Sequence, residues 1–168
     1  MTAARIRKAN GADLAAIHDV EVSAADAFVR FGRPLPDGSP PAPAAQWRAA
    51  MAADLAWVVE HGGEVVGFLA GRAAGEVLHI EEMDVRSDRQ RRGLGRALLE
   101  AALKAAKGRG FASVTLTTYR DIPWNAPFYA RAGFQELEEG NIDERLSDIL
   151  ADEARRGFRD RCAMRIAL

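Results

Sequence analysis

The stretch from Ile80 to Gly110 constrains the fold more than any other part of the chain. A segment that ends at Val85 leads into a basic turn with glycines at 93 and 95, and an alanine-rich amphipathic segment follows. Glycine lets a backbone turn sharply and approach a ligand without a side-chain clash. The first N–H groups of the helix predicted behind the turn lack partners, and with the helix dipole they favour an anion. The sequence therefore predicts a strand, an anion-binding turn and a helix in succession.

Positive charge gathers at the same turn, which carries Arg89, Arg91, Arg92 and Arg96. The spacing argues against two common phosphate motifs. A dinucleotide fingerprint requires a third glycine where this chain has Leu98, and a P-loop requires Lys and then Ser or Thr where this chain has Arg96 and Ala97. The turn therefore predicts a pyrophosphate cradle of another type. The alternative is a solvated, arginine-rich turn that only caps the helix.

Length, charge and cysteine content set further limits. The 168 residues suit one ordinary domain, which we place at 1–168. The formal net charge of −1 gives no general attraction to nucleic acid. Cys162 is the single cysteine, which excludes an intrachain disulfide and fits a reducing compartment. No apolar run reaches the length of a membrane span and the N-terminus shows no secretory segment, so we expect a cytoplasmic protein without a membrane partner.

Hydrophobic periodicity and turn residues predict a mixed α/β domain. We expect helices near residues 14–24, 44–54, 97–107, 128–132 and 141–156, and strands at 5–9, 57–60, 64–71, 77–85, 111–119, 134–137 and 161–168. The proline-rich stretch 34–43 breaks regular structure and predicts a surface loop. The strand, helix and strand between residues 77 and 119 imply a parallel strand pair.

Two motifs, in this order, resemble those of the GCN5-related N-acetyltransferase (GNAT) family. The stretch Gln90-Arg91-Arg92-Gly93-Leu94-Gly95 is similar to that family's acetyl-CoA-binding pattern, Gln/Arg-x-x-Gly-x-Gly/Ala. The stretch Phe128-Tyr129-Ala130-Arg131-Ala132-Gly133-Phe134 is similar to the family's Phe/Leu-Tyr-x-x-x-Gly-Phe segment. The resemblance implies a mixed, mostly antiparallel central sheet flanked by helices, in which a parallel strand pair splays apart to admit the pantetheine arm.

The same resemblance implies acetyl-CoA as co-substrate and no metal. A backbone N–H of Met83 or Val85 would polarise the thioester carbonyl. The residues that the resemblance assigns to the cofactor are Met83, Asp84, Val85, Gln90, Arg91, Arg92, Gly93, Leu94, Gly95, Arg96, Asn125 and Phe128. Many relatives carry an Asn seven residues before the tyrosine, where this chain has Ile122. Asn125 either replaces that cofactor contact or only caps the following helix.

Acetyl transfer to an amine needs a base that takes the amine proton and a group that protonates the departing thiolate. The resemblance makes Tyr129 the proton donor. The alternative is a tyrosine that packs by its ring, with its hydroxyl at the surface. Transfer would occur by direct attack in a ternary complex, without a covalent acetyl-enzyme.

The base belongs to the predicted strand 77–85, which carries four ionisable residues. Burying an unpaired charge is costly, so these side chains must be paired, at the rim or functional. A period of two places His79, Glu81 and Met83 on one face and Glu82 and Asp84 on the other, although a bulge would change this facing. Aligned on the glycine motif, Glu81 takes the position where some polyamine-acetylating relatives hold their basic carboxylate, and His79 the position of that group in histone-acetylating relatives. The resemblance therefore implies Glu81 as the base, with His79, directly or through a water, as the alternative.

The sequence thus predicts an N-acetyltransferase that acts on a primary amine, either a small molecule or a protein amino group. The alternative is a non-catalytic acyl-CoA-binding regulatory domain on the same fold. Acidic residues that hint at a cationic acceptor, and aromatic residues that would flank it, are Asp26, Glu81, Glu82, Asp121, Tyr119 and Trp124. The sequence leaves a homodimer open.

Overall fold

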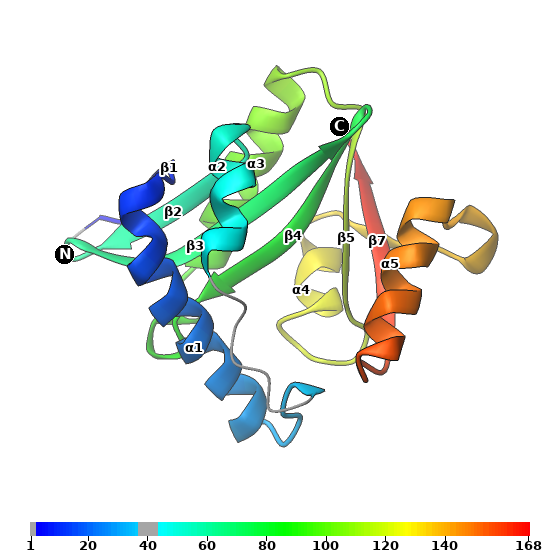
Figure 1. Ribbon diagram of the computed structural model, residues 1–168, viewed down its shortest axis with the longest axis horizontal. Helices are drawn as coiled ribbons and strands as arrows, with labels where there is room; N and C mark the ends of the chain where they lie inside the picture. Colours follow the sequence, from blue (N-terminus) through cyan, green and yellow to red (C-terminus); the bar gives the residue numbers. More distant parts are fainter. Residues whose placement is uncertain (1–2, 37–43) are drawn as a thin grey trace.

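The computed structural model describes residues 3–36 and 44–168, over which the chain forms one seven-stranded sheet with helices on both faces (Figure 1). Part of the proline-rich loop predicted at 34–43, residues 37–43, lies outside the described residues. The strands are β1 (Arg5–Lys8), β2 (Ala56–His61), β3 (Glu64–Ala74), β4 (Val77–Val85), β5 (Ser113–Tyr119), β6 (Gln135–Glu136) and β7 (Arg161–Ala167). The helices are α1 (Leu14–Arg30), α2 (Arg48–Ala52), α3 (Leu94–Gly108), α4 (Ala126–Arg131) and α5 (Glu144–Arg155).

The strand order is β1-β2-β3-β4-β5-β7-β6, and every neighbouring pair is antiparallel except β4 and β5. This arrangement confirms the predicted mixed, mostly antiparallel sheet. The parallel pair is short, because the recorded partners run only from Val77–Ser113 to His79–Thr115. Beyond this point β4 and β5 diverge, as Figure 1 shows. The predicted splay is therefore present, and it opens the middle of the sheet.

Two apolar clusters hold the helices against the sheet. On one face, the stripe Leu94, Leu98, Leu99, Ala102 and Ala106 of α3 packs with β-strand residues and with Tyr129 and Phe134 from the region of α4. On the other face, Ile17 and Val20 of α1 pack with Trp47, Val58 and Phe68. Figure 1 shows α1 and α2 in front of the sheet and α3 behind it. The helices on opposite faces therefore fix the two sides of β4 independently.

A β-bulge in β4 changes the predicted facing of its side chains. The register places Ala70 opposite Glu82 and Gly71 opposite Ile80, so Glu81 is the extra residue. Leu78, Ile80, Met83 and Val85 then all reach the cluster under α3. His79 contacts Thr115 on the other face, where Glu82 and Asp84 also lie, near α1. The predicted grouping of His79 with Met83 is therefore wrong, because the bulge inserts one residue into the alternation.

Several element boundaries differ from those predicted. Residues 44–54 form a 3-10 turn (Ala44–Trp47) followed by the short α2. The helix predicted at 141–156 begins at Glu144, because the Asp143 side chain accepts a hydrogen bond from the backbone N–H of Leu146 and caps it. The strand predicted at 134–137 is limited to the two residues of β6.

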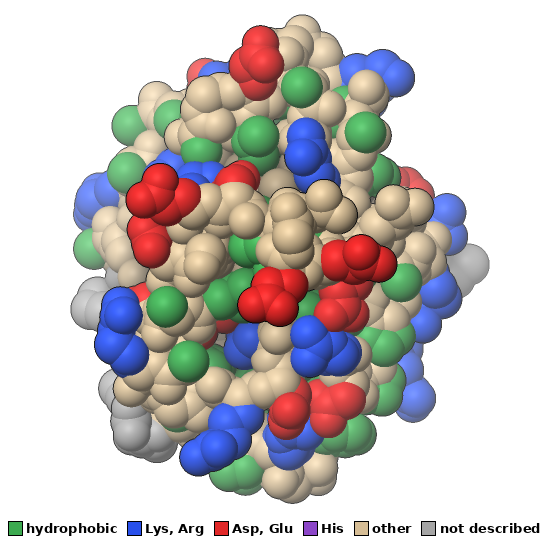
Figure 2. All heavy atoms as spheres, turned by 90° about the vertical axis from the view of Figure 1, so that its right-hand side faces the viewer, with side chains coloured by type: hydrophobic (Ala, Val, Ile, Leu, Met, Phe, Trp, Pro, Cys, Tyr) green, Lys and Arg blue, Asp and Glu red, His purple; other side chains and the backbone are tan. Residues whose placement is uncertain are grey.

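Charged side chains of both signs are mixed over the face that carries α5 and β7 (Figure 2). Neither sign forms a continuous field on that face. Among the described residues, no helix combines the length and apolar character that crossing a bilayer requires.

Removing a leucine from the α3 stripe should destabilise the fold. Leu98 is fully buried in the cluster under α3, so Leu98→Ala should lower the free energy of unfolding by about 2–5 kcal/mol, through lost burial and a residual cavity. Urea unfolding followed by circular dichroism measures this change. Lys104→Ala, at an exposed position of the same helix, is the control and should stay within about 0.5 kcal/mol. Equal effects of the two substitutions would contradict the packing described here.

Candidate active site

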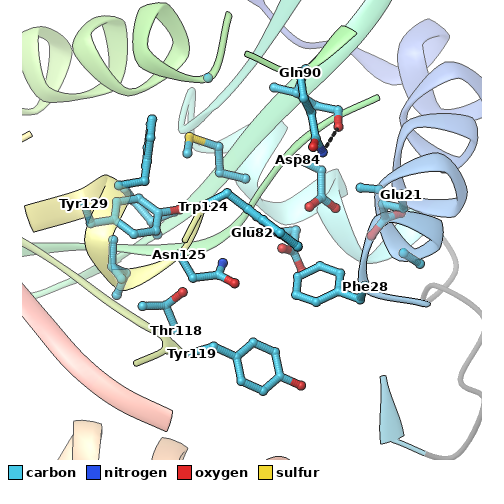
Figure 3. Close-up of a pocket in the computed structure, with 18 of the residues that line it drawn as sticks. Glu21, Phe28, Glu82, Asp84, Gln90, Thr118, Tyr119, Trp124, Asn125 and Tyr129 are labelled. Carbon is cyan, nitrogen blue, oxygen red and sulfur yellow. Dashed lines mark hydrogen bonds between the residues drawn. The ribbon is translucent and has the colours of Figure 1, made fainter. Parts of the chain in front are cut away.

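A cavity of about 1070 Å³ opens between the diverging strands. Its walls come from α1, β4, the turn before α3, the end of β5, α4, and the region of α5 and β7 (Figure 3). Of the residues that the sequence assigns to the cofactor or to catalysis, the cavity is lined by Glu81, Met83, Asp84, Val85, Gln90, Arg91, Gly93, Leu94, Gly95, Arg96, Asn125, Phe128 and Tyr129. Arg92 is exposed and is not among these lining residues. The fold thus brings segments some fifty positions apart to one space.

The turn before α3 forms one end of the cavity. Gly93 is the N-cap residue of α3 at φ 78°, a left-handed conformation that glycine adopts without strain. The Gln90 carboxamide donates a hydrogen bond to the carbonyl oxygen of Val85 at 3.0 Å (Figure 3), and the Ser87 N–H donates to the Ser23 hydroxyl of α1 at 3.0 Å. These bonds hold the turn against β4 and α1. The N-terminal N–H groups of α3 are thereby presented to the cavity as an anion site.

Gly95 lies in the first turn of α3, directly over the cavity. A Cβ at this position would meet Val85 Cγ2 at 3.7 Å and Phe128 Cζ at 3.8 Å, which are ordinary contacts. Packing within the protein therefore does not demand glycine here. Any larger side chain would project into the space beside the cradle.

Tyr129 of α4 is buried between Phe128 and Phe134, whose rings it meets edge-on. Its hydroxyl points toward the middle of the cavity (Figure 3). Burial, and next the nearby Glu82 and Asp84 carboxyls, raise the pKa of the Tyr129 phenol above its ordinary value. The phenol is therefore protonated at neutral pH, as an ordinary tyrosine is.

Asn125 occupies the N-cap position of α4, but its side chain makes no capping hydrogen bond. Its carbonyl oxygen Oδ1 is buried without a hydrogen-bond partner among the described residues. The side chain lies at the cavity wall beside Thr118 (Figure 3). The sequence left open whether Asn125 contacts the cofactor or caps α4. The capping hydrogen bond is not formed, and the unpartnered Oδ1 lies at the cavity wall. Ile122, at the position where relatives carry Asn, is fully buried.

Three carboxylates converge on the cavity from α1 and β4: Glu21, Glu82 and Asp84 (Figure 3). One carboxylate oxygen from each lies within 4.8 Å of the others. Burial, followed by the charge of Glu82, raises the pKa of Glu21 to about 7. Burial and the neighbouring carboxyls likewise raise the pKa of Asp84, while burial raises that of Glu82 against the opposing effect of Arg161. Sequence reasoning missed Glu21, although a glutamate beside Ile17, Val20 and Ala24 on an apolar helix stripe is the signal that identifies it.

The two predicted candidates for the base lie in different surroundings. Glu81, on the bulge, lines the cavity, and its carboxylate lies 3.4 Å from Nε of Arg72. His79 is buried, and its Nδ1 lies 3.0 Å from the Thr115 hydroxyl. Burial, and next the charge of Arg145, lower the pKa of His79 to about 4. His79 is also not among the described residues that line the cavity, which argues against it as the base.

Aromatic rings form the wall opposite the cradle. Phe28 of α1 contacts both Tyr119 and Trp124, at centroid distances of 5.8 and 5.4 Å. The acids Asp26 and Asp121, which hinted at a cationic acceptor, do not line this cavity and pair instead with Arg30 at 3.2 Å and Arg33 at 2.7 Å. The structure therefore does not place these two side chains at the site.

A buried ion pair completes the wall on the side of α5 and β7. Arg161 donates to both carboxylate oxygens of Glu153, at 2.9 and 3.0 Å, and the Thr117 hydroxyl donates to the same carboxylate at 2.6 Å. These two charges neutralise each other. Cys162, next to Arg161, is buried in the core, and burial raises the pKa of its thiol to about 11, so it is not an activated nucleophile.

The raised pKa of Glu21 makes stability depend on pH. The folded state holds the proton up to about pH 7 and the unfolded chain only to about 4.5, so this stabilising contribution is full below pH 4.5 and lost as the pH rises through 7. Glu21→Gln removes the contribution. Between pH 4.5 and pH 8, the free energy of unfolding of the variant should therefore rise by about 2–3 kcal/mol relative to that of the unchanged protein. Urea unfolding measures the free energy of unfolding of both proteins at both pH values. If the difference between variant and unchanged protein is the same at pH 4.5 and pH 8, Glu21 is not protonated in the folded state.

Comparison with known proteins places this geometry in a family. The Acetyltransferase (GNAT) family profile matches residues 8–134. The mouse protein N-acetyltransferase 8 is 30% identical over 93 residues, which cover 52% of this chain and 41% of the mouse protein. This chain therefore spans less than half the length of that relative.

Solved structures share the fold at low sequence identity. N-acetylglutamate synthase from Neisseria gonorrhoeae, in complex with coenzyme A and N-acetyl-glutamate, superposes with a TM-score of 0.72 at 19% identity and covers 100% of this chain and 36% of its own. The PaiA N-acetyltransferase from Thermoplasma acidophilum, in complex with coenzyme A, superposes with a TM-score of 0.70 at 14% identity, over 99% of both chains. The family match extends over most of the described chain and includes both the anion-binding turn and Tyr129. The chain therefore belongs to the GNAT acetyltransferase family.

Proposed function

We propose that this chain transfers an acetyl group from acetyl-CoA to a primary amine that attacks directly in a ternary complex. One observation carries the proposal: the anion-binding turn at the start of α3 and the protonated Tyr129 of α4 open onto the same cavity. The coenzyme A present in the two similar structures suits this arrangement. A diphosphate at the cradle would place the rest of an extended cofactor along the space between β4 and β5.

The cradle would bind the diphosphate through backbone N–H groups of residues 91–96, with Arg91 and Arg96 adding positive charge. Gln90 is bonded to Val85, so its role is to brace the turn. Farther along, the unpartnered Oδ1 of Asn125 would accept a hydrogen bond from an amide N–H of the pantetheine arm. The edge of β4 beyond His79 has no partner in β5, which leaves it for the cofactor. Backbone N–H groups of Met83 or Val85 would polarise the thioester carbonyl there.

The reaction needs a neutral amine, and its nitrogen would attack the thioester carbonyl as the C–N bond forms. The amine proton passes to a carboxylate, for which we retain Glu81, since it lines the cavity and lies outside the three-carboxylate cluster. As the C–S bond breaks, the coenzyme A sulfur takes the Tyr129 proton, which solvent then replaces. The protein thus supplies alignment, carbonyl polarisation and two proton transfers.

Loss of the phenol should impair chemistry more than binding. Tyr129→Phe should reduce kcat by about 100-fold or more, because the thiolate would leave without a proton donor. The dissociation constant of acetyl-CoA should change less than about threefold, since the ring packing is kept. A thiol-release assay and calorimetric titration measure the two quantities.

The result also separates the proposed enzyme from a regulatory domain. Unchanged turnover of the best amine would remove Tyr129 from the mechanism. Tight binding of acetyl-CoA without turnover over a broad amine panel would indicate a non-catalytic acyl-CoA-binding domain instead.

Filling the space beside the cradle should block the cofactor. Gly95→Val projects a branched side chain into the cavity. The dissociation constant of acetyl-CoA should therefore rise at least about tenfold, which corresponds to a loss of about 1.4 kcal/mol of binding free energy. Gly108→Val makes the same change at the exposed end of α3, where a Cβ meets nothing within 4 Å. That control should bind acetyl-CoA as the unchanged protein does. Equal binding by both variants would place the diphosphate elsewhere.

A further inference from the structure

The carboxyl groups of Glu21, Glu82 and Asp84 form a cluster between α1 and β4. Within residues 3–36 and 44–168, none of the three makes an ion pair. The other acids at the cavity wall do have partners: Glu153 pairs with Arg161 and Glu81 lies beside Arg72. The cluster is therefore the part of the cavity whose carboxyl groups lack an ion-pair partner among the described residues, and Arg161 acts on Glu82 only from beyond ion-pair distance.

Glu21 supplies an independent sign that a ligand belongs there. Its side chain is buried, with only 6% of the residue exposed, and its Oε2 has no hydrogen-bond partner among the described residues. It extends from α1 toward Glu82 and Asp84 (Figure 3). A buried polar atom without a partner is costly, and a cation that fills the cluster would remove that cost.

The spacing of the cluster fits a primary ammonium group. The three oxygens lie within 4.8 Å of one another. An ammonium carries three N–H donors, and three acceptors at about 2.8 Å around a tetrahedral nitrogen lie about 4.6 Å apart. Octahedral Mg²⁺ at about 2.1 Å requires neighbouring oxygens only about 3.0 Å apart. The limit of 4.8 Å accommodates an ammonium group, and titration with Mg²⁺ or Ca²⁺ separates the two occupants.

A nitrogen held by this cluster is not the one that is acetylated. Nearby negative charges favour the protonated form of an amine, whereas a nucleophilic amine must be neutral. The acceptor then needs a second amino group for the reaction itself. We propose, on the basis of the acetyltransferase function above, that Glu21, Glu82 and Asp84 bind the non-reacting ammonium group of an aliphatic diamine.

The surroundings of the cluster suit such an acceptor. Phe28 and Trp124 line the adjacent wall and would contact the methylene chain between the two nitrogens. The charged and titratable groups that act on the cluster are Tyr129 from α4, Glu153 from α5 and Arg161 from β7. Because burial holds protons on the cluster, arrival of an ammonium group should release protons from it.

Matched amines test the inference. The unchanged protein with saturating acetyl-CoA is compared on 1,4-diaminobutane and on butylamine, which has the same chain and one nitrogen. The ratio of kcat/KM should favour the diamine by about tenfold or more. In Glu21→Gln, and in Asp84→Asn as a second variant, this ratio should fall toward one. Asp26→Asn, at an exposed position of the same helix, should keep the original ratio.

Calorimetry adds a readout that does not need turnover. Titration of the protein with 1,4-diaminobutane at pH 7, in two buffers of different ionisation enthalpy, should show net proton release that is lost in Glu21→Gln. Diamine binding with Glu21-dependent proton release but without turnover would support the diamine-binding role of the cluster. The same result would overturn the proposed enzyme activity. Thermal unfolding of each variant confirms that it is folded.

Three results would overturn the inference. The first is equal kcat/KM for the diamine and the monoamine, which leaves the acetyltransferase function standing. The second is turnover of another amine without binding of 1,4-diaminobutane. The third is binding of Mg²⁺ or Ca²⁺ that depends on Glu21 and is not displaced by the diamine, which would make the cluster a metal site.

Discussion

The end of hydrogen bonding between β4 and β5 is the constraint on which the site depends. The two strands pair only from Val77–Ser113 to His79–Thr115, and after that each is held by its other neighbour, β3 or β7. Continued pairing would close the middle of the sheet and leave no cavity. The gap is tolerable because α3 and α4 share one apolar cluster behind it, which fixes both walls without contact between the strands. An unpaired strand edge needs polar partners, and an extended cofactor can supply them.

Electrostatics divide the cavity into two ends. The turn before α3 combines arginines with the N-terminus of a helix, whereas the wall between α1 and β4 carries three carboxylates. Burial, and next the same Glu82 and Asp84 carboxyls, raise the pKa of the Tyr129 phenol. The acidic cluster and the proton donor are thus coupled, since negative charge disfavours a phenolate. Under the proposed function, the same group of residues would bind a cation and protonate the departing sulfur.

Most of the fold was predictable from local patterns. The succession of strand, turn and helix around Gly93 and the apolar stripe of α3 follow from short-range periodicity, and the structure confirms them. The strand β5 also forms where it was predicted, although its residues are buried almost continuously rather than in alternation. The short strand β6 and the exact extent of α2 did not follow, because tertiary contacts set such boundaries. The anion-binding turn was predictable for a similar reason, since its chemistry is contained in consecutive residues.

The facing of side chains along β4 was not predictable, because a single inserted residue at Glu81 reverses the alternation beyond it, and that insertion depends on the register with β3. Glu21 was missed because it lies about sixty positions from Glu82, and only the packing of α1 on the sheet brings them together. The sequence by itself determined the order of elements, the glycine-containing turn before α3 and the place of Tyr129 in the helix after β5. Tertiary structure alone decided which acids share one buried space, since a carboxyl's charge and role depend on the neighbours that burial gives it.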